Sequence, residues 1–192
     1  HLGNGCSASA VRGGVAIETS MGLTPLQGLV MGTRSGDVDP GLHTFLHNEL
    51  GMSIGDIDTL LNKQSGLKGM AGVNDFRELE ERRASGDEAA QLAFEVYVHR
   101  LKHYLGAYLA QLGRLDVLNF TAGVGENNPA LRAAVVDDLD GLGFQLDVEL
   151  NDTPSKAARL ISADASPIKI AVVPTNEELA IARETAALLE AR

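Results

Sequence analysis

The chain has 192 residues, 44% of them hydrophobic, and a formal net charge of −10. This length and apolar content suffice for one well-cored domain and exclude a disordered or fibrous protein. No run approaches the roughly eighteen apolar residues of a membrane-spanning helix, and no signal-like segment is visible, so we expect no membrane partner. The acidic charge, without a long basic run, makes a nucleic-acid partner unexpected. The single cysteine, Cys6, suits a reducing compartment such as the cytoplasm.

The first third of the chain predicts a hairpin, a loop and two short helices. Residues 6–11 and 15–20 flank a Gly-Gly break, which is typical of a β-hairpin. Residues 20–41 are punctuated by glycine and proline and predict a loop or a short helix. Helices are predicted over 42–51, stopped by Gly51, and over 53–66, where Ser53 is a plausible N-cap.

The remainder predicts a long helix and then alternating strands and helices. Residues 87–113 form an amphipathic pattern that begins near Asp87 and ends before Gly113. Its apolar stripe is formed by Leu92, Val96, Leu101, Leu105, Tyr108 and Leu112. Strands are predicted within 115–120 and 163–175, each followed by a helix. This alternation favours a single α/β domain with some parallel strand pairing.

The strand-to-helix segment TAGVGEN, residues 121–127, is the first candidate site. Gly123 and Gly125 permit a tight turn and close approach of a ligand, and helix N-termini attract anions. The dinucleotide fingerprint is incomplete because Asn128 stands where the third glycine would be, and the lysine of a Walker loop is absent. From this segment alone, a structural turn and a ligand site are equally supported.

Two further segments carry charged residues that suit a phosphate ligand. Arg34 lies in a glycine-flanked loop, and its guanidinium matches a phosphate or a carboxylate. Taken alone, an ion pair with Asp37 or Asp39 is slightly favoured over that function. Glu177 lies in the first helical turn after a strand, where the helix dipole explains a carboxylate and Mg²⁺ coordination is the alternative.

Weaker signals favour structural roles. The histidine pairs 43/47 and 99/103 have a spacing that can bind zinc, but neither has the accompanying glutamate or a third ligand. The tyrosines of the long helix are expected in the core or an interface. Cys6 lacks a recognisable histidine–carboxylate partner set, so a nucleophilic role is not expected.

Five segments occur in order and are far more specific together than singly: HLGNG (1–5), ETSMGLTPLQGLVMGTRSGDVDP (18–40), GVNDFREL (72–79), FTAGVGEN (120–127) and VPTNEELAIARET (173–185). With them the chain resembles the acetate kinase family. The resemblance runs from His1 to the last helix.

The resemblance implies an α/β, ribonuclease-H-like domain of the actin/Hsp70 ATPase type, with a mixed sheet flanked by helices. Residues 1–192 would be the C-terminal nucleotide-binding domain, with the N-terminal domain absent from this chain. The implied activity is reversible phosphoryl transfer between ATP and acetate, which gives acetyl phosphate and ADP and requires Mg²⁺ or Mn²⁺. The family also implies a cytoplasmic homodimer.

The resemblance further implies roles for individual residues. The phosphate-contacting loop would be His1, Leu2, Gly3, Asn4 and Gly5. The adenosine side of the pocket would be Asp75, Phe76, Arg77, Gly123, Val124, Gly125, Glu126 and Asn127. Arg34 would stabilise the transferring phosphoryl group, and Glu177 would help to hold the metal ion.

Departures from the family leave alternatives open. Glu18 stands where the family has aspartate, a change of one methylene. A complete acetate kinase is about twice as long, and its other half carries a second phosphate motif and most of the acyl pocket. The isolated half is therefore expected to be inactive. A non-catalytic nucleotide-binding or dimerising module and half of a propionate or butyrate kinase remain alternatives.

Overall fold

A computed structural model of the chain describes residues 1–190. Strands β1 (Ser9–Arg12) and β2 (Val15–Thr19) form the predicted antiparallel hairpin. The second sheet is three-stranded in the order β3-β5-β4, and β3 (Val117–Phe120) is parallel to β5 (Lys169–Val172). The short β4 (Arg159–Leu160) pairs antiparallel with β5. The prediction of an α/β fold with a mixed sheet is therefore confirmed.

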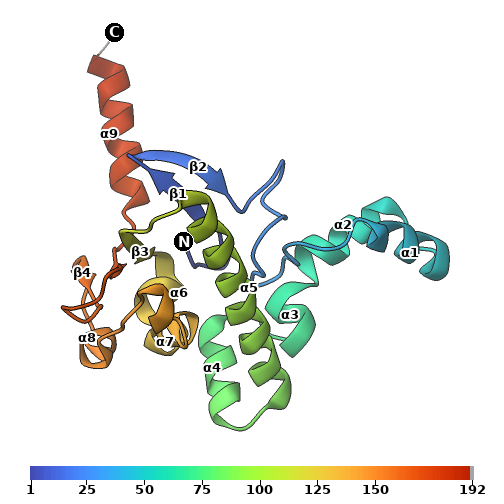
Figure 1. Ribbon diagram of the computed structural model, residues 1–192. Helices are drawn as coiled ribbons and strands as arrows, with labels where there is room; N and C mark the ends of the chain where they lie inside the picture. Colours follow the sequence, from blue (N-terminus) through green and yellow to red (C-terminus); the bar gives the residue numbers. More distant parts are fainter. Residues whose placement is uncertain (191–192) are drawn as a thin grey trace.

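The helices lie around these two sheets (Figure 1). They are α1 (Gly41–Leu50), α2 (Ile54–Lys63), α3 (Gly66–Ala71), α4 (Phe76–Ala84), α5 (Glu88–Leu112), α6 (Ala122–Asn127), α7 (Pro129–Val136), the short 3-10 helix η1 (Asp140–Leu142), α8 (Val148–Asp152) and α9 (Glu177–Glu190). The long α5 crosses the middle of the molecule, whereas α1 and α2 extend to one side and α9 projects from the body. Within residues 1–190, none of these helices combines the length and apolarity that a membrane span requires.

Local capping interactions are found at the helix ends that the sequence predicts. Ser53 accepts a hydrogen bond from the Asp56 amide, and the Asp56 side chain accepts one in return from the Ser53 amide, which completes a capping box. Asp87 accepts from the amides that begin α5. Gly51 and Gly113 adopt left-handed conformations after α1 and α5.

The main core forms on one face of α5, which packs against α3, α4, α7 and β1. The buried residues of this face follow helical spacing and include Ala90, Ala93, Phe94, Tyr97 and Leu101. The predicted stripe is wrong at its N-terminal end, because Leu92 is 57% exposed. Two small residues, Ala90 and Ala93, occupy the buried positions there, in the main core shared with residues of α3 and α4.

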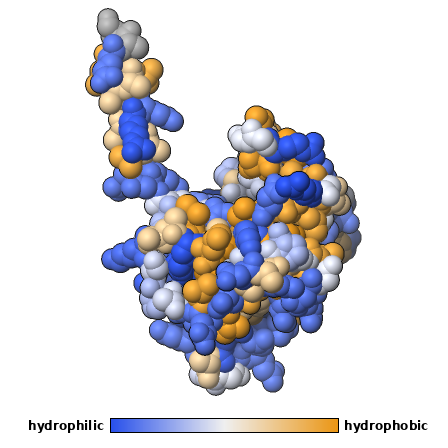
Figure 2. Space-filling view, turned by 60° about the vertical axis from the view of Figure 1, so that its left-hand side comes forward, coloured by the Kyte–Doolittle hydropathy of each residue, from blue (hydrophilic) through white to orange (hydrophobic). Residues whose placement is uncertain are grey.

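Two parts of the chain lie apart from the main core. Helices α1 and α2 form a small core of their own around Leu46, Ile57 and Leu61. No residue of α9 is buried, and Figure 2 shows this helix standing clear of the body as an arm. Its apolar residues, including Leu179, Ile181, Leu188 and Leu189, are exposed.

Candidate functional site

A cavity of about 830 Å³ opens where the N-terminal loop, the start of α4, the long α5 and the turn into α6 meet. It is lined by Gly3, Asn4, Gly32, Leu67, Asn74, Asp75, Phe76, Arg77, Glu80, Tyr97, Gly123, Val124, Asn127 and Asn128. Four of the five segments singled out in the sequence therefore meet around one cavity, although they lie far apart along the chain.

Backbone hydrogen bonds hold the N-terminal loop against α6 and the loop before Arg34. The amide of Leu2 donates to the carbonyl of Thr121 at 2.9 Å, and the amide of Val124 donates to the carbonyl of Leu2 at 2.8 Å. On the other side, the Gly32 amide donates to the Asn4 carbonyl at 3.1 Å. A Cβ at Gly32 would lie 2.9 Å from the backbone carbonyl oxygen of Asn74, so this close approach favours glycine.

The two glycines of the turn into α6 have different surroundings. An added Cβ at Gly123 would meet no atom within 4 Å, and this glycine lines the cavity. Gly125 is buried instead, and a Cβ there would lie 3.6 Å from Leu2 and from Phe120. Gly123 thus leaves room for a ligand, whereas Gly125 faces the packed interior, where a Cβ would make ordinary contacts.

The start of α4 provides the polar rim of the cavity. Asp75 caps the helix by accepting from the Arg77 amide at 2.8 Å, and it also accepts two hydrogen bonds from the Arg77 guanidinium. These bonds lower the pKa of Asp75 to about 2, so it is a carboxylate at any physiological pH. Phe76, between these two residues in the sequence, is buried, and the centroid of its ring lies 5.1 Å from that of Tyr97. The cavity therefore has an apolar wall beneath a charged rim.

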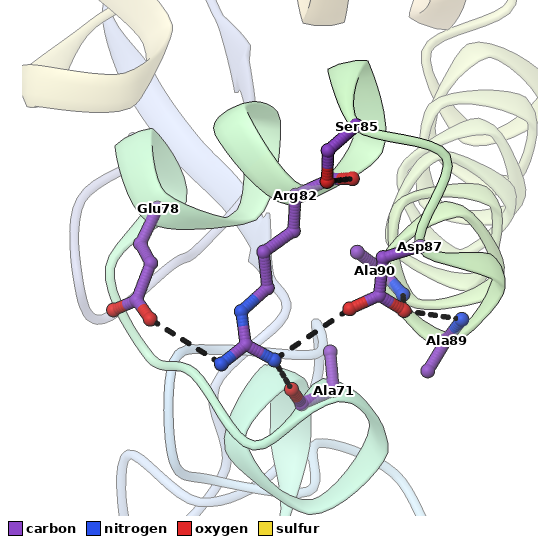
Figure 3. A network of polar contacts seen from close by, with 7 residues as sticks. All are labelled: Ala71, Glu78, Arg82, Ser85, Asp87, Ala89 and Ala90. Atoms are coloured by element: carbon purple, nitrogen blue, oxygen red, sulfur yellow. Dashed lines mark hydrogen bonds and ion pairs between the residues drawn. The ribbon is translucent and has the colours of Figure 1, made fainter.

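Arg82 fixes the far end of α4 to two neighbouring helices (Figure 3). Its guanidinium donates to the carbonyl of Ala71 at 3.0 Å and forms ion pairs with Glu78 and Asp87. Asp87 at the same time caps α5 through the amides of Ala89 and Ala90. This network connects the ends of α3, α4 and α5, and so holds the helices that form this wall of the cavity.

Cys6 and Tyr97 meet in the buried layer below the cavity. The Cys6 sulfur lies 2.8 Å from the Tyr97 hydroxyl. Burial raises the pKa of the Cys6 thiol to about 11 and raises the pKa of the Tyr97 phenol well above its ordinary value. Both groups are neutral near pH 7, in keeping with a structural role for this cysteine.

We expect Cys6 to resist alkylation in the folded chain. A thiol whose pKa is raised from 9.0 to about 11 has a thiolate fraction about 100-fold lower at pH 8, and only the ionised form reacts. Iodoacetamide labelling followed by intact mass should show at least this slowing relative to the chain in 6 M guanidinium. Labelling at equal rates in both conditions would contradict the buried, neutral thiol.

Arg34 lies beside the cavity rather than in its lining. Its guanidinium donates to the carbonyl of Pro25 at 3.2 Å, and it lies 3.3 Å from where a Cβ of Gly5 would be. The favoured ion pair with a neighbouring aspartate is wrong. Asp37 pairs with Arg100 and accepts from Tyr104, while Asp39 accepts from the Gly41 amide. Within residues 1–190, no carboxylate lies within 4.0 Å of the Arg34 guanidinium.

Glu177 lies apart from the cavity, in the first turn of α9. Among residues 1–190 no group of three histidine, cysteine, aspartate or glutamate side chains is close enough to hold a metal ion. Glu126, at the end of α6, accepts from the Thr175 amide at 3.0 Å and so ties the segment before α9 to the turn. Glu177 is therefore connected to the turn into α6 only through the chain segment that begins at Thr175, and it is not part of a cluster of metal-ligating side chains in the described residues.

The structure thus divides the predicted site residues into two groups. Those that line the cavity are Gly3, Asn4, Asp75, Phe76, Arg77, Gly123, Val124 and Asn127. Those that do not are His1, Leu2, Gly5, Arg34, Gly125, Glu126 and Glu177. The lining residues that the sequence did not single out are Gly32, Leu67, Asn74, Glu80, Tyr97 and Asn128. Gly32 and Asn74 lie within recognised segments and Asn128 directly follows one, but nothing local marks Leu67, Glu80 or Tyr97.

Arg132 is a further residue that no sequence signal singles out. It is 1% exposed, and its guanidinium donates to the carbonyls of Gly125 and Glu126, both at 2.9 Å. Two more bonds reach the side chain and the carbonyl of Asn151 on α8. Desolvation lowers the pKa of Arg132 to about 10, which still leaves it charged at neutral pH. It satisfies the carbonyls at the end of α6 and thereby positions the cavity wall.

This α/β architecture is also found in solved structures of kinases, of which the chain matches about half. The chain matches the crystal structure of Porphyromonas gingivalis acetate kinase with a TM-score of 0.94 and 44% identity, over 98% of this chain and 48% of that one. It matches a propionate kinase from Francisella tularensis with a TM-score of 0.90 and 47% identity, over 96% of this chain and 47% of that one.

The sequence comparisons identify the family. The model of the acetokinase family matches residues 1–183, and the chain belongs to this family. It is 58% identical over 184 residues to the acetate kinase of Leifsonia xyli subsp. xyli, which covers 96% of this chain and 46% of that protein. The chain therefore spans about half the length of the relatives it matches.

Proposed function

We propose that this chain is the C-terminal, nucleotide-binding half of an ATP-dependent acetate kinase. The reaction is reversible phosphoryl transfer between ATP and acetate, with acetyl phosphate and ADP as products. The observation that carries the proposal is the single cavity assembled from the HLGNG, NDFR and GVGENN segments. Its volume of about 830 Å³ suits a ligand of nucleotide size.

The cavity's two sides suit the two ends of a nucleotide. Phe76 and Tyr97 offer an aromatic wall, and the exposed Arg77 guanidinium is placed to stack on a base or to contact a phosphate. Gly3 and Gly123 bring backbone close to the ligand without side chains. We therefore place the adenosine on the Asp75–Arg77 side and the phosphates near the N-terminal loop.

Arg34 suits the stabilisation of the transferring phosphoryl group. Phosphoryl transfer depends on in-line positioning and on charge stabilisation, and an arginine finger that stabilises the transition-state charge contributes about 10³–10⁵ in rate in GTPases. The Arg34 guanidinium lies next to Gly5 of the N-terminal loop and has no ion-pair partner among the described residues. It is therefore available to a phosphate that extends past Gly3 and Asn4.

The predicted residues outside the lining receive supporting roles. Leu2, Gly125 and Glu126 hold the turn through packing and hydrogen bonds, and His1 anchors the loop by donating from its amino group to Ser7. Gly5 leaves space for the Arg34 guanidinium.

A divalent cation, Mg²⁺ or Mn²⁺, would neutralise phosphate charge when bound. Glu177 would hold it with water ligands and phosphate oxygens, since Mg²⁺ commonly takes only one or two protein carboxylates. Glu177 is exposed and forms no ion pair with another described residue, which is the state that such a role requires.

Other aspects of the proposal rest on the family. The propionate kinase neighbour keeps a propionate- or butyrate-using enzyme open as an alternative. A homodimeric, cytoplasmic enzyme is also part of the proposal. A non-catalytic nucleotide-binding or dimerising module is the remaining alternative, and the presence of Arg34 disfavours it because such a module needs no phosphoryl clamp.

Calorimetric titration of the 192-residue chain with ADP tests the proposal. We expect saturable binding that strengthens when Mg²⁺ is added, and no acetyl phosphate formation by this chain alone. Activity should appear when the other half of a relative's sequence is supplied in trans. Binding without any restored activity would favour the non-catalytic module, and absence of binding at millimolar ADP would contradict the nucleotide assignment.

A further inference from the structure

The loop that carries Arg34 closes on itself at its base. The Asp37 amide donates to the Gly28 carbonyl at 2.9 Å, and the Gly28 amide donates to a carboxylate oxygen of Asp37 at 3.1 Å. Further along, the Met31 amide donates to the Arg34 carbonyl at 3.2 Å. Residues 28–37, here called the arginine loop, therefore form a closed unit that carries Arg34 close to its tip.

The base of the arginine loop is held on α5. The second carboxylate oxygen of Asp37 pairs with the Arg100 guanidinium and accepts from the Tyr104 hydroxyl at 2.6 Å. The Asp37 and Arg100 side chains are 32% and 24% exposed, so the ion pair is partly shielded from water. Desolvation, together with the bond to Asp37, raises the pKa of the Tyr104 phenol, which therefore stays a donor at neutral pH. Asp37 thus fastens a loop without helix or strand to the long central helix.

The same face of α5 also lines the nucleotide cavity. Tyr97, Arg100 and Tyr104 are spaced by three and four positions, so they follow one face of the helix. Tyr97 lines the cavity at one end of this face, and the other two residues hold the arginine loop. At its tip, the loop touches the cavity again, where the Gly32 amide donates to the Asn4 carbonyl. One rigid helix therefore sets the place of the arginine loop relative to the cavity.

The tip of the arginine loop is fastened separately, to the start of α3. The Leu67 amide donates to the Met31 carbonyl at 3.0 Å, and the Lys68 amide donates to the Gly32 carbonyl at 2.9 Å. The loop is thus held at both ends, and release of its base would leave it to pivot on the tip. The Arg34 guanidinium itself has few restraints, since its hydrogen bonds go to the Pro25 carbonyl and to the Met31 sulfur.

We propose that Asp37 is a positioning residue for Arg34. The proposal rests on the role in phosphoryl transfer proposed above for Arg34. An arginine stabilises developing charge only where its guanidinium is held in place, and a misplacement of about 1 Å can cost about 100-fold in rate. Asp37 supplies that restraint from a distance, because its carboxylate is occupied by donors from Gly28, Arg100 and Tyr104.

Calorimetric titration of the 192-residue chain with Mg²⁺-ATP and with Mg²⁺-ADP tests the proposal. Arg34 would contact the phosphoryl group that ATP has and ADP lacks, so the ratio of the two dissociation constants reports on its placement. A general loss of folded chain affects both titrations and leaves this ratio unchanged. We expect Arg34→Ala to lower the preference for ATP at least about fivefold, and Asp37→Ala and Arg100→Met to lower it at least about threefold.

Asp39→Asn is the matched control. Asp39 lies two positions beyond the arginine loop, and among residues 1–190 its side chain bonds only to the Gly41 amide. This variant should keep the ATP preference of the unaltered chain.

Amide hydrogen exchange at Met31 is a second readout that needs no nucleotide. We expect this amide, which donates to the Arg34 carbonyl, to exchange at least about fivefold faster in Asp37→Ala. The buried Ile161 amide, which donates to Ile170, reports on global stability and should change much less.

An ATP preference that falls in Arg34→Ala but survives both Asp37→Ala and Arg100→Met would overturn the proposal. Unchanged exchange at Met31 in Asp37→Ala would overturn it as well. An unchanged ratio in Arg34→Ala would contradict the role proposed for Arg34 and the positioning role with it. Absence of nucleotide binding would contradict the proposed function, and the exchange at Met31 would still decide whether Asp37 holds the arginine loop.

Discussion

Gly123→Trp is expected to weaken ADP binding strongly while the fold stays intact. The indole would project into the cavity, since nothing lies within 4 Å of the site of a Cβ at Gly123 and the residue lines the cavity. Gly123 also lies in a helix, where any other residue except proline is favoured over glycine. Calorimetry should show the dissociation constant for ADP raised at least about tenfold, a loss of about 1.4 kcal/mol or more.

Gly106→Trp is the matched control. Gly106 is also helical and exposed, and a Cβ there meets nothing within 4 Å, but it does not line the cavity. The chain contains no tryptophan, so each variant carries a single indole whose fluorescence reports its surroundings. We expect ADP to bind the Gly106 variant normally. Normal ADP binding by a folded Gly123→Trp variant would contradict the assignment of this cavity as the nucleotide site.

Arg132→Met is expected to destabilise the folded chain strongly. The buried guanidinium makes four hydrogen bonds, to the carbonyls of Gly125, Glu126 and Asn151 and to the Asn151 side chain. Methionine fills a similar volume but leaves these groups buried without partners. Removing a charged donor from such a network costs about 3 kcal/mol or more. Urea denaturation measures the change as a lower transition midpoint.

Two variants make the Arg132 result specific. Arg132→Lys keeps the charge, but its single ammonium cannot span the separate acceptors that the planar fork reaches, so we expect most of the loss to persist. Arg114→Met removes an arginine whose pair with Asp116 is exposed, and its midpoint should match that of the unaltered chain. An Arg132→Met chain as stable as the Arg114→Met chain would show that the carbonyls find other partners.

Much of the fold can be predicted because its signals are local. The caps at Ser53 and Asp87 and the left-handed glycines 51 and 113 act within one helical turn, and the structure confirms each of them. The prediction is wrong at Leu92 because apolar periodicity does not show where a neighbouring helix approaches. The buried positions there are Ala90 and Ala93, which share the main core with residues of α3 and α4.

The site can be predicted only in part for the same reason. The segments around Asn4, Phe76 and Gly123 carry recognisable motifs, and the structure brings them to one cavity. Glu80 and Tyr97 line it through helix packing, which no nearby residue signals. The aspartates near Arg34 are plausible partners by spacing, but Asp37 pairs instead with Arg100, 63 positions further along the chain.

The isolation of α9 has a consequence for how this chain melts. A helix of 14 residues that buries none of them depends on local hydrogen bonds alone, and such helices are marginal in water. Its helicity should fade gradually with temperature, ahead of the cooperative transition of the body. Circular dichroism and tyrosine fluorescence, which reports on Tyr97, Tyr104 and Tyr108 of α5, would then give transitions that do not coincide. The free energy of unfolding of the body should therefore be derived from the tyrosine fluorescence transition, which does not include the melting of α9.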